Sequence, residues 1–241
     1  MLKQDAITPL YVQLMEELET SIRNGVYKPG DKIMTEAEMA KEYGVSLITV
    51  RKAVGSLMEK GLVMRKQGKG TFVTKPKYSR NMKKLQSFTE MCEQMGVKPG
   101  AQVLENRLIM ADKKVADRLG IEPGSNVVYI SRLRLADGDP VQVEKSYFPL
   151  KYAFLLEEDL NNGSMFECLK EKAGAKVASS EKMIELCRAT AEEAALMDVK
   201  KGDYLLFVKS TAYDENGEPM YAGIQLINGD RFSLYVYESG K

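Results

Sequence analysis

The sequence predicts an α+β protein with an N-terminal winged helix-turn-helix and a C-terminal antiparallel-sheet domain. Three patterns support this fold class: two short amphipathic segments joined by a glycine, a glycine-rich hairpin, and a helix-strand-hairpin-strand unit that occurs twice. The 241 residues, 44% of them hydrophobic, are enough for two domains of ordinary size. We predict a winged helix-turn-helix domain over 1–75, a linker over 76–84 and a second domain over 85–241.

Three helices are expected in the first domain. Thr8 is placed to cap the first helix, with Pro9 in its first turn, and Asn24-Gly25 ends its apolar repeat. The capping-box pattern over 35–38 then predicts a second helix, which should run to about Tyr43.

A third helix follows almost at once. Gly44 should close the second helix, and Ser46 is placed to cap the next one, which continues to Lys60-Gly61. Two short helices joined by so short a turn containing glycine are typical of a helix-turn-helix.

A small hairpin comes next in the sequence. Residues 62–66 and 71–74 have strand character and flank Gln67-Gly68-Lys69-Gly70, whose glycines permit positive φ. We predict that this hairpin is the wing. The following segment contains Pro76 and has no apolar period, which is typical of an interdomain linker.

Basic residues are concentrated in one part of the chain. The net charge is only +1, but residues 50–84 hold eleven Lys and Arg against one acid, Glu59, so the remainder has 24 basic and 33 acidic residues. This segregation favours a local polyanion site on an acidic body. A solvated linker is an alternative explanation for residues 75–84 alone.

The helix-turn-helix indicates which side chains meet DNA. The N-terminal turn of the second helix in such a motif faces the base edges of the major groove. Arg51 is suited to a bidentate contact with guanine, and Lys52 to a phosphate. The candidate DNA-contacting residues are Thr35, Ser46, Thr49, Arg51, Lys52, Arg65, Lys66, Gly68, Lys69 and Gly70.

The second domain contains a weak internal duplication. Residues 115–140 and 193–219 share a helix, a turn, an apolar strand and a hairpin turn that ends in proline, at an offset of 78 to 79 residues. Asp112 and Thr190 are placed to cap the two equivalent helices. Two such units predict an antiparallel sheet with helices packed on one side and a cleft between the halves.

A pair of arginines marks the first repeat. Arg132 and Arg134 are two positions apart on a predicted strand and therefore point to the same face. The hairpin register places Glu144 opposite Arg132. The second repeat has Ser210 and Gly223 at the equivalent positions, so the architecture itself does not require these charges.

Paired arginines near a helix start suggest an anion receptor. Ser164 opens a predicted helix through a capping box with Glu167, and its hydroxyl and the first amides are suited to complete a site for phosphate or carboxylate. The alternative is a solvated sheet face that carries an ordinary cross-strand ion pair.

The first domain resembles a known family in four segments. They are Pro-Leu-Tyr-Val-Gln-Leu (9–14), Ile-Arg-Asn-Gly-Val-Tyr-Lys-Pro-Gly-Asp-Lys-Ile (22–33), Val-Ser-Leu-Ile-Thr-Val-Arg-Lys-Ala (45–53) and Gln-Gly-Lys-Gly-Thr-Phe-Val (67–73). These look like the GntR family of bacterial regulators, which implies a DNA-binding transcription factor, most often a repressor. Two arginines associated with DNA contact in the family are Ala37 and Leu47 here, whereas Arg51 and the wing glycines match.

The second domain is similar to the UTRA effector domain of the HutC branch of that family, which has a chorismate-lyase-like fold. The matching segments are 132–140 and 229–231. The resemblance extends to repressors that answer to N-acetylglucosamine metabolites, and it implies a small anionic effector, either a sugar phosphate or a carboxylate. The positions that it implies hold the phosphate are Arg132, Arg134 and Ser164, and those that help form the pocket are Ser87, Phe88, Thr89, Glu144 and Arg231.

The mode of action follows from general features of operator recognition. We expect a homodimer, because two recognition helices on a pseudo-palindrome raise affinity and specificity together, and we expect the sheet of the second domain to supply the contact. An effector that binds one arrangement of the two DNA-reading heads better than the other then changes operator affinity.

Composition argues against several other classes of protein. The chain has no histidine, which removes the common triads of hydrolases, and its three cysteines form no CxxC pair, so we expect neither a metal site nor a cofactor. It has no apolar run of membrane-spanning length and no signal peptide, so we expect a cytoplasmic protein. Two alternatives stay open: a lyase-like enzyme, and a metabolite-binding module with lost or altered DNA specificity.

Overall fold

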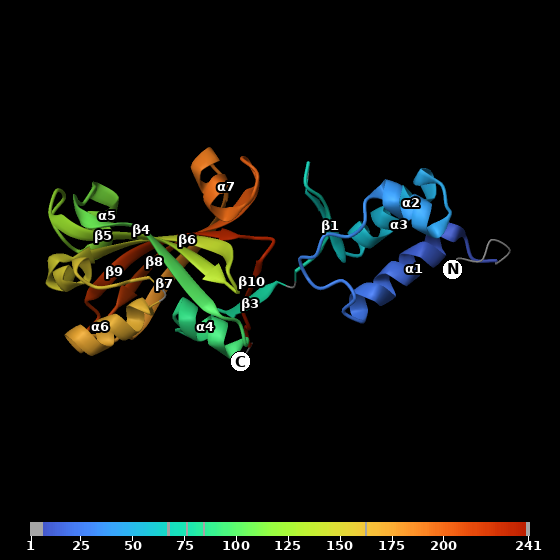
Figure 1. The fold of residues 1–241 in the computed structure, drawn as a ribbon. Coiled ribbons are helices and arrows are strands. Elements are labelled where there is room, and N and C mark those ends of the chain that lie inside the picture. The colour runs from blue at the N-terminus through green and yellow to red at the C-terminus, as the bar shows by residue number, and fades with distance from the viewer. Residues whose placement is uncertain (1–6, 67, 76, 84, 162, 240–241) are drawn as a thin grey trace. The chain divides into compact units, whose positions relative to one another are not determined.

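The structure, a computed structural model, describes residues 7–66, 68–75, 77–83, 85–161 and 163–239. The chain divides into two compact units, residues 1–76 and 77–241, which we describe one at a time (Figure 1). Gln67 of the predicted wing tip, and Pro76 and Lys84 of the predicted linker, lie outside the described residues.

The first unit contains three helices and a two-stranded sheet, as the sequence predicts. Its elements are α1 (Leu10–Arg23), α2 (Glu36–Tyr43), α3 (Leu47–Glu59), β1 (Val63–Lys66) and β2 (Gly70–Val73). The strands β1 and β2 pair antiparallel, with Lys66 opposite Gly70. Gly68 and Gly70 have φ of 73° and 123°, which explains why the hairpin turn needs glycine.

Capping residues set the ends of α2 and α3. Thr35 forms both halves of a capping box with Glu38, and Gly44 ends α2 in the left-handed conformation at φ 63°. The Ser46 side chain accepts from the Thr49 amide and so starts α3. Only residues 44–46 lie between α2 and α3, which confirms the predicted helix-turn-helix.

The predicted start of α1 was wrong by one residue. The capping position is Pro9 and not Thr8, because Pro9 keeps an extended ψ of 142° while its carbonyl accepts from Val12 and Gln13. The Thr8 carbonyl instead accepts a hydrogen bond from the Gln13 side chain.

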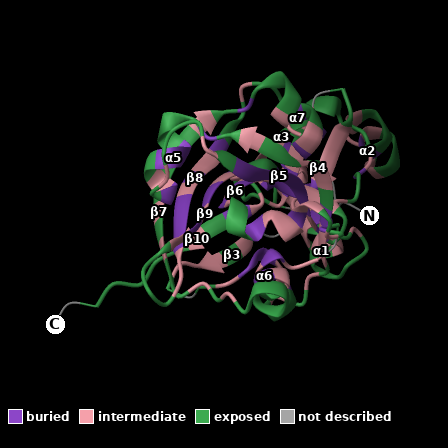
Figure 2. Ribbon diagram, turned by 90° about the vertical axis from the view of Figure 1, so that its left-hand side faces the viewer, coloured by how far each residue is buried: buried purple, intermediate pink, exposed green. Residues whose placement is uncertain are grey.

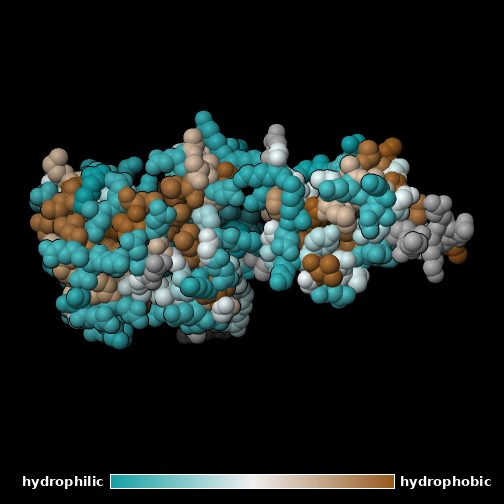
Figure 3. All heavy atoms as spheres, viewed as in Figure 1, coloured by the Kyte–Doolittle hydropathy of each residue, from teal (hydrophilic) through white to brown (hydrophobic). Residues whose placement is uncertain are grey.

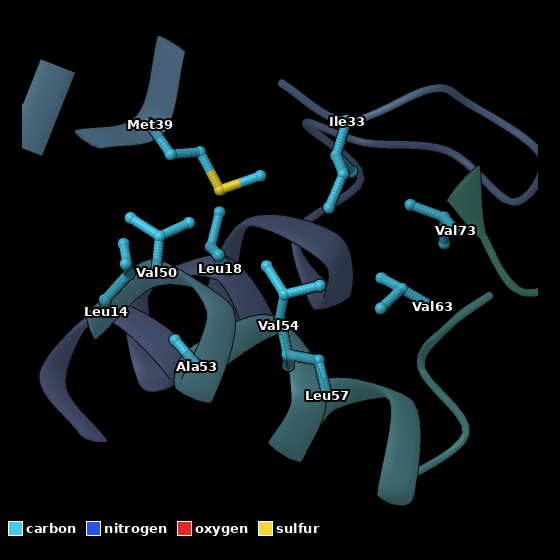
Figure 4. Close-up of a cluster of buried hydrophobic side chains, with 10 residues drawn as sticks. All are labelled: Leu14, Leu18, Ile33, Met39, Val50, Ala53, Val54, Leu57, Val63 and Val73. Atoms are coloured by element: carbon cyan, nitrogen blue, oxygen red, sulfur yellow. The ribbon is translucent and has the colours of Figure 1, made fainter. Parts of the chain in front are cut away.

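One apolar core holds the first unit together (Figure 4). Leu14 and Leu18 of α1 pack with Met39 of α2 and with the buried face of α3. The buried residues of α3 are Val50, Ala53, Val54 and Leu57, which together form its inner face. The core thus fixes which face of α3 is presented to a partner.

The second unit is built on a six-stranded antiparallel sheet in the order β4-β5-β6-β9-β8-β7. Its strands are β3 (Tyr78–Asn81), β4 (Pro99–Met110), β5 (Asn126–Ala136), β6 (Asp139–Pro149), β7 (Ser179–Arg188), β8 (Tyr204–Tyr213), β9 (Pro219–Asn228) and β10 (Phe232–Tyr235). Its helices are α4 (Phe88–Gln94), α5 (Lys113–Leu119), η1 (Leu150–Leu156), α6 (Met165–Ala173) and α7 (Ala191–Met197).

The strand order reflects the predicted duplication. Each half is a strand, a capped helix and a hairpin: β4, α5, β5 and β6, and then β7, α7, β8 and β9. The two halves meet where β6 pairs with β9. Asp112 and Thr190 cap α5 and α7, as predicted.

Helices cover both faces of this sheet, whereas the sequence predicted helices on one side. On one face, α5 and α7 pack on residues such as Val127 and Leu133 of β5. On the other, η1 and α6 pack on Val128 and Ile130, and α4 packs near Ala136. This double cover explains why β5 is buried almost throughout (Figure 2), and it was missed because α4, η1 and α6 lie outside the repeat.

The predicted linker contains a strand of the second unit. Residues 78–81 form β3, which pairs in parallel with β10, and the Tyr78 ring packs against Phe232 at a centroid distance of 5.3 Å. The partner strand lies about 150 residues later in the chain, which is why a local pattern did not reveal β3.

Candidate functional sites

The first turn of α3 carries the residues that the sequence placed against DNA. The Ser46 and Thr49 hydroxyls lie 2.9 Å apart, while Arg51 and Lys52 lie one turn further on and are exposed. The Lys52 ammonium sits 3.9 Å from the centroid of the Tyr11 ring of α1, which restricts the position of this charge.

A carboxylate at the start of α2 joins the recognition helix to the wing. Glu36 accepts from Arg51 Nε at 2.8 Å through one oxygen and from Arg65 Nη2 of β1 at 2.5 Å through the other. The Arg51 hydrogen bond, with help from the charge of Arg65, lowers the pKa of Glu36. The two predicted cationic elements therefore share one surface of the unit.

A hollow lies beside the wing on the same surface. Basic residues of β1 and of the segment before α2 line it, together with Thr35, Glu36 and Ala37 at the start of α2. The residues that contribute from the strands and turns are Lys32, Ile33, Arg65, Lys66, Gly68, Gly70 and Thr71. Glu36 thus lies among the cations of this surface. The sequence patterns predicted no role for it, although its place in the first turn of the second helix was predicted.

The second unit has a cavity on the sheet face that α4 and α6 cover. Its volume is about 50 Å³. The structure gathers seven of the eight residues predicted for the effector site around it: Ser87, Phe88, Thr89, Arg132, Arg134, Glu144 and Ser164. Their cross-strand register is as predicted, with Glu144 opposite Arg132.

Arg231 is the predicted residue that does not line the cavity. Its guanidinium donates to Asp139 at 3.0 Å and to the Tyr78 hydroxyl at 3.0 Å. Arg231 follows β9 in the short turn before β10, so it ties the β3 and β10 pair to the β5-β6 hairpin. Arg231 is therefore not among the described residues that line the cavity, and its role in effector binding stays a prediction.

Arg132 is buried with its hydrogen-bonding capacity in use. Its Nε donates to Glu144 at 2.9 Å, Nη2 donates to the same carboxylate, and Nη1 donates to the carbonyls of Leu160 and Gly163. Burial raises the pKa of Glu144, but the charges of Arg132 and Arg134 lower this pKa by more than burial raises it. The carboxylate therefore stays ionised. Arg132 thereby fastens the loop that leads to Ser164 and α6.

Arg134 is equally buried but poorly satisfied. Its side chain donates to the Thr89 hydroxyl at 3.3 Å and lies 4.5 Å from the centroid of the Phe88 ring. Its Nε and Nη1 atoms find no hydrogen-bond partner among the residues that the structure describes. Burial lowers the pKa of Arg134 to about 10, which leaves it cationic at neutral pH.

The two repeats contribute differently to the cavity. Where β5 and β6 place Arg132 opposite Glu144, β8 and β9 place Ser210 opposite Gly223. A Cβ atom at Gly223 would lie 2.9 Å from the Ser210 hydroxyl, so the glycine permits a close approach. At this pair of positions the second repeat therefore has small uncharged residues where the first has an arginine and a glutamate.

Three cations that line the cavity, Arg80, Lys145 and Lys182, were not predicted. Arg80 of β3 donates to Gln225 at 3.1 Å, and burial lowers its pKa. Lys182 of β7 also lines the cavity, and burial, with the nearby Arg80 charge, lowers the pKa of Lys182 to about 8. Arg80 was missed because it lies in the segment that was predicted to be a linker. Lys182 could have been found, because extending the predicted repeat by one strand toward the N-terminus gives β7.

Cys92 is buried and Cys168 and Cys187 are half-buried, and all three are free. Burial raises the pKa of the Cys92 thiol to about 11, which makes it unreactive. None of the helices in the described part of the chain has the length and apolar content that a membrane span requires.

Comparison with known proteins agrees with both halves of this description. Residues 10–73 match the bacterial regulatory proteins of the gntR family, and residues 94–233 match the UTRA domain. The HTH-type transcriptional repressor NagR of Bacillus subtilis (strain 168) is 34% identical over 235 residues, which cover 98% of this chain and 96% of that protein. A probable fructoselysine utilization operon transcriptional repressor of Escherichia coli (strain K12) is 29% identical and spans 94% of this chain and 93% of its own.

A solved structure shows the same two-unit fold. The crystal structure of PhnF from Mycobacterium smegmatis has a TM-score of 0.67 with 26% sequence identity, and the match covers 94% of this chain and 99% of that one. The curated relatives are transcriptional repressors and not enzymes. This chain therefore belongs to the HutC branch of the GntR family of bacterial regulatory proteins, and it is a DNA-binding transcriptional regulator with a UTRA domain for a metabolite effector.

Proposed function

We propose that this regulator is a repressor that releases its operator when a small anionic metabolite binds at Arg134. The observation that carries the proposal is that this side chain is 2% exposed and yet leaves Nε and Nη1 without a hydrogen-bond partner in the described part of the chain. Burial of an unpaired polar group lowers stability, and an anion that accepts both N–H groups restores the lost hydrogen bonds. The names of the relatives support repression.

We infer that the anion is the phosphate of a sugar phosphate. Thr89 and Ser164 bring hydroxyls to the cavity, and Ser164 begins α6, whose first amides favour a negative charge. Glu144, Gln225 and the Tyr221 phenol are suited to bind sugar hydroxyls elsewhere in the cavity. Burial raises the pKa of Tyr221, so its hydroxyl remains a donor.

Arg132 has a different task from Arg134 in this proposal. Its donors are already used by Glu144 and by the loop before α6, so it positions Ser164 and offsets the carboxylate charge. A phosphate near Glu144 would otherwise meet a bare negative charge. Arg132 is therefore a positioning residue, and Arg134 is the residue that binds the anion.

A thermal-shift screen of glucosamine 6-phosphate, N-acetylglucosamine 6-phosphate, fructose 6-phosphate and citrate tests this proposal. We expect at least one phosphate ester to raise the unfolding temperature, and its unphosphorylated sugar to have no effect. The variant Arg134→Gln should lose the shift, whereas Arg107→Gln, as the matched control at an exposed arginine that does not line the cavity, should keep it. A shift that survives in Arg134→Gln would contradict the assignment of the anion to this arginine.

We also infer that α3 and the wing contact the operator through the basic residues named above. Glu36 pairs with Arg51 and Arg65, and the adjacent hollow is lined by Arg65 and Lys66. Ser46 caps α3, and Thr49 lies in its first turn. Arg51→Ala should weaken specific binding by about 1–3 kcal/mol in a mobility-shift assay, while non-specific binding changes much less. An unchanged footprint would remove Arg51 from the reading residues.

A homodimer, located in the cytoplasm where operators are, completes the proposal. The strand β7 is an edge of the sheet and exposes Met183, Ile184 and Leu186 by 58%, 41% and 67%. An edge strand with exposed apolar side chains is suited to pairing with a second copy. Light scattering should report a dimer, and Leu186→Lys should reduce it to a monomer, whereas a monomeric wild-type protein would contradict the proposal.

A further inference from the structure

Two large apolar side chains are exposed at the start of the recognition helix. Leu47 and Ile48 occupy the first two positions of α3, and 45% and 77% of their surfaces are accessible. In Figure 3, apolar atoms lie at the surface of this unit in the region of α2 and α3. Exposure of two large apolar side chains in water does not stabilise the fold. A partner surface that these side chains contact would explain their exposure.

Neither side chain contributes to the core of the unit. The buried face of α3 consists of Val50, Ala53, Val54 and Leu57, and no residue earlier in the helix joins that cluster. The cap that starts the helix is formed by Ser46 and the Thr49 amide, and thus does not depend on Leu47 or Ile48. The fold leaves both side chains available.

The polar groups around this pair are engaged within the unit. The Ser46 and Thr49 hydroxyls contact each other at 2.9 Å, and Arg51, four residues after Leu47 and on the same face, is held by Glu36. Lys52, four residues after Ile48, lies over Tyr11. The foremost surface of the recognition helix is therefore apolar, with cations one turn behind it.

The chemistry of the major groove identifies what such a surface can read. Base edges there present hydrogen-bond donors and acceptors, and the apolar group among them is the 5-methyl group of thymine. We propose that Leu47 and Ile48 contact thymine methyl groups in the major groove. This regulator then prefers thymine at base positions where a recognition helix with a polar first turn would form hydrogen bonds with the base edge. The proposal rests on the DNA-binding role of the family and adds the base that these two residues select.

Removal of one methyl group from the DNA tests the proposal without altering the protein. A binding sequence is first obtained by selection from a random duplex pool, and each thymine is then replaced by deoxyuridine, which lacks the methyl group and keeps the hydrogen bonds. We expect one or two positions per half-site at which the replacement weakens binding about fourfold, which corresponds to ~0.8 kcal/mol for one buried methyl-sized group. Equal affinity for all thymine and deoxyuridine duplexes would overturn the proposal, as would a selected sequence without thymine in the half-sites.

Protein variants assign the effect to these side chains. Leu47→Ala with Ile48→Ala should bind the thymine duplex more weakly and should no longer distinguish it from the deoxyuridine duplex. The matched control is Met58→Ala, which removes an exposed apolar side chain (39% accessible) from the last turn of the same helix and should keep the preference. If the double variant keeps the preference, or changes only the oligomeric state in light scattering, the pair serves a protein contact and the proposal is wrong.

Discussion

Arg132 and Arg134 lie two residues apart on one face of β5, and both are 2% exposed, yet their bonding differs sharply. Arg132 donates to Glu144 and to two carbonyls, whereas Arg134 leaves Nε and Nη1 without a partner among the described residues. Of these two neighbours on one face, Arg132 is therefore used by the fold, whereas Arg134 keeps donors for the proposed effector.

This difference predicts opposite effects on stability. Arg132→Met should lower the free energy of unfolding by roughly 3 kcal/mol, because it leaves the Glu144 carboxylate buried and unpaired. Arg134→Met should instead raise it by ~1 kcal/mol in the absence of effector, because it removes two buried N–H groups that lack acceptors. Urea unfolding measures both, and a loss of stability in Arg134→Met would show that the guanidinium supports the fold.

The pKa of Lys182 predicts how effector binding depends on pH. Because its pKa is lowered to about 8, the ammonium is charged at pH 7 and mostly neutral at pH 9. A bound anion favours the charged form, so binding takes up a proton above pH 8 and the affinity should fall up to roughly tenfold between pH 7 and 9. Calorimetry with the phosphate ester found in the screen measures this change.

The matched variants for that experiment are Lys182→Met and Lys209→Met. Lys182→Met should bind more weakly at pH 7 but lose most of the pH dependence up to pH 9. Lys209, which pairs with Glu185 on the neighbouring strand, is not among the residues that line the cavity, so its variant should titrate like the wild type. A full pH dependence in Lys182→Met would assign the effect to another group.

Local patterns predicted much of this structure. The caps at Thr35, Ser46 and Asp112 and the register of Arg132 with Glu144 were all readable, because caps and two-residue hairpin turns act within a few positions. The predicted duplication also gave the central strands of the sheet.

What the sequence did not reveal depends on distant contacts. The pairing of β3 with β10 and the arrival of Arg80 at the cavity join residues about 145 to 150 positions apart. The different states of Arg132 and Arg134 were also hidden, because the carbonyls of Leu160 and Gly163 reach only one of them. The two-residue spacing predicted that both arginines lie on one face of the strand, but it did not predict their hydrogen-bond partners.

Glu36 predicts a separation of DNA affinity from DNA specificity. Its carboxylate holds Arg51 and Arg65, and it also brings a negative charge to a surface that meets phosphates. Glu36→Gln should strengthen non-specific binding several-fold, because that charge is removed, and weaken discrimination between specific and random duplexes, because Arg51 is less well oriented. Competition assays at two salt concentrations separate the two effects. Glu38→Gln removes a nearby negative charge and weakens the cap of α2 but leaves the Glu36 contacts with Arg51 and Arg65, so it controls for charge and helix stability.

Two glycines of the first unit predict opposite outcomes of the same substitution. Gly70 has φ 123°, a conformation that residues with a Cβ atom rarely adopt, so Gly70→Ala should destabilise the unit by more than about 1 kcal/mol and weaken DNA binding through the wing. Gly55 lies within α3 with open space around its Cβ position, so Gly55→Ala should stabilise the unit by about 0.5–1 kcal/mol. Thermal unfolding of the full chain, with mobility shifts on the same duplex, measures both. If Gly70→Ala left stability and DNA affinity unchanged, the hairpin would not be held in the conformation on which its role as a wing depends.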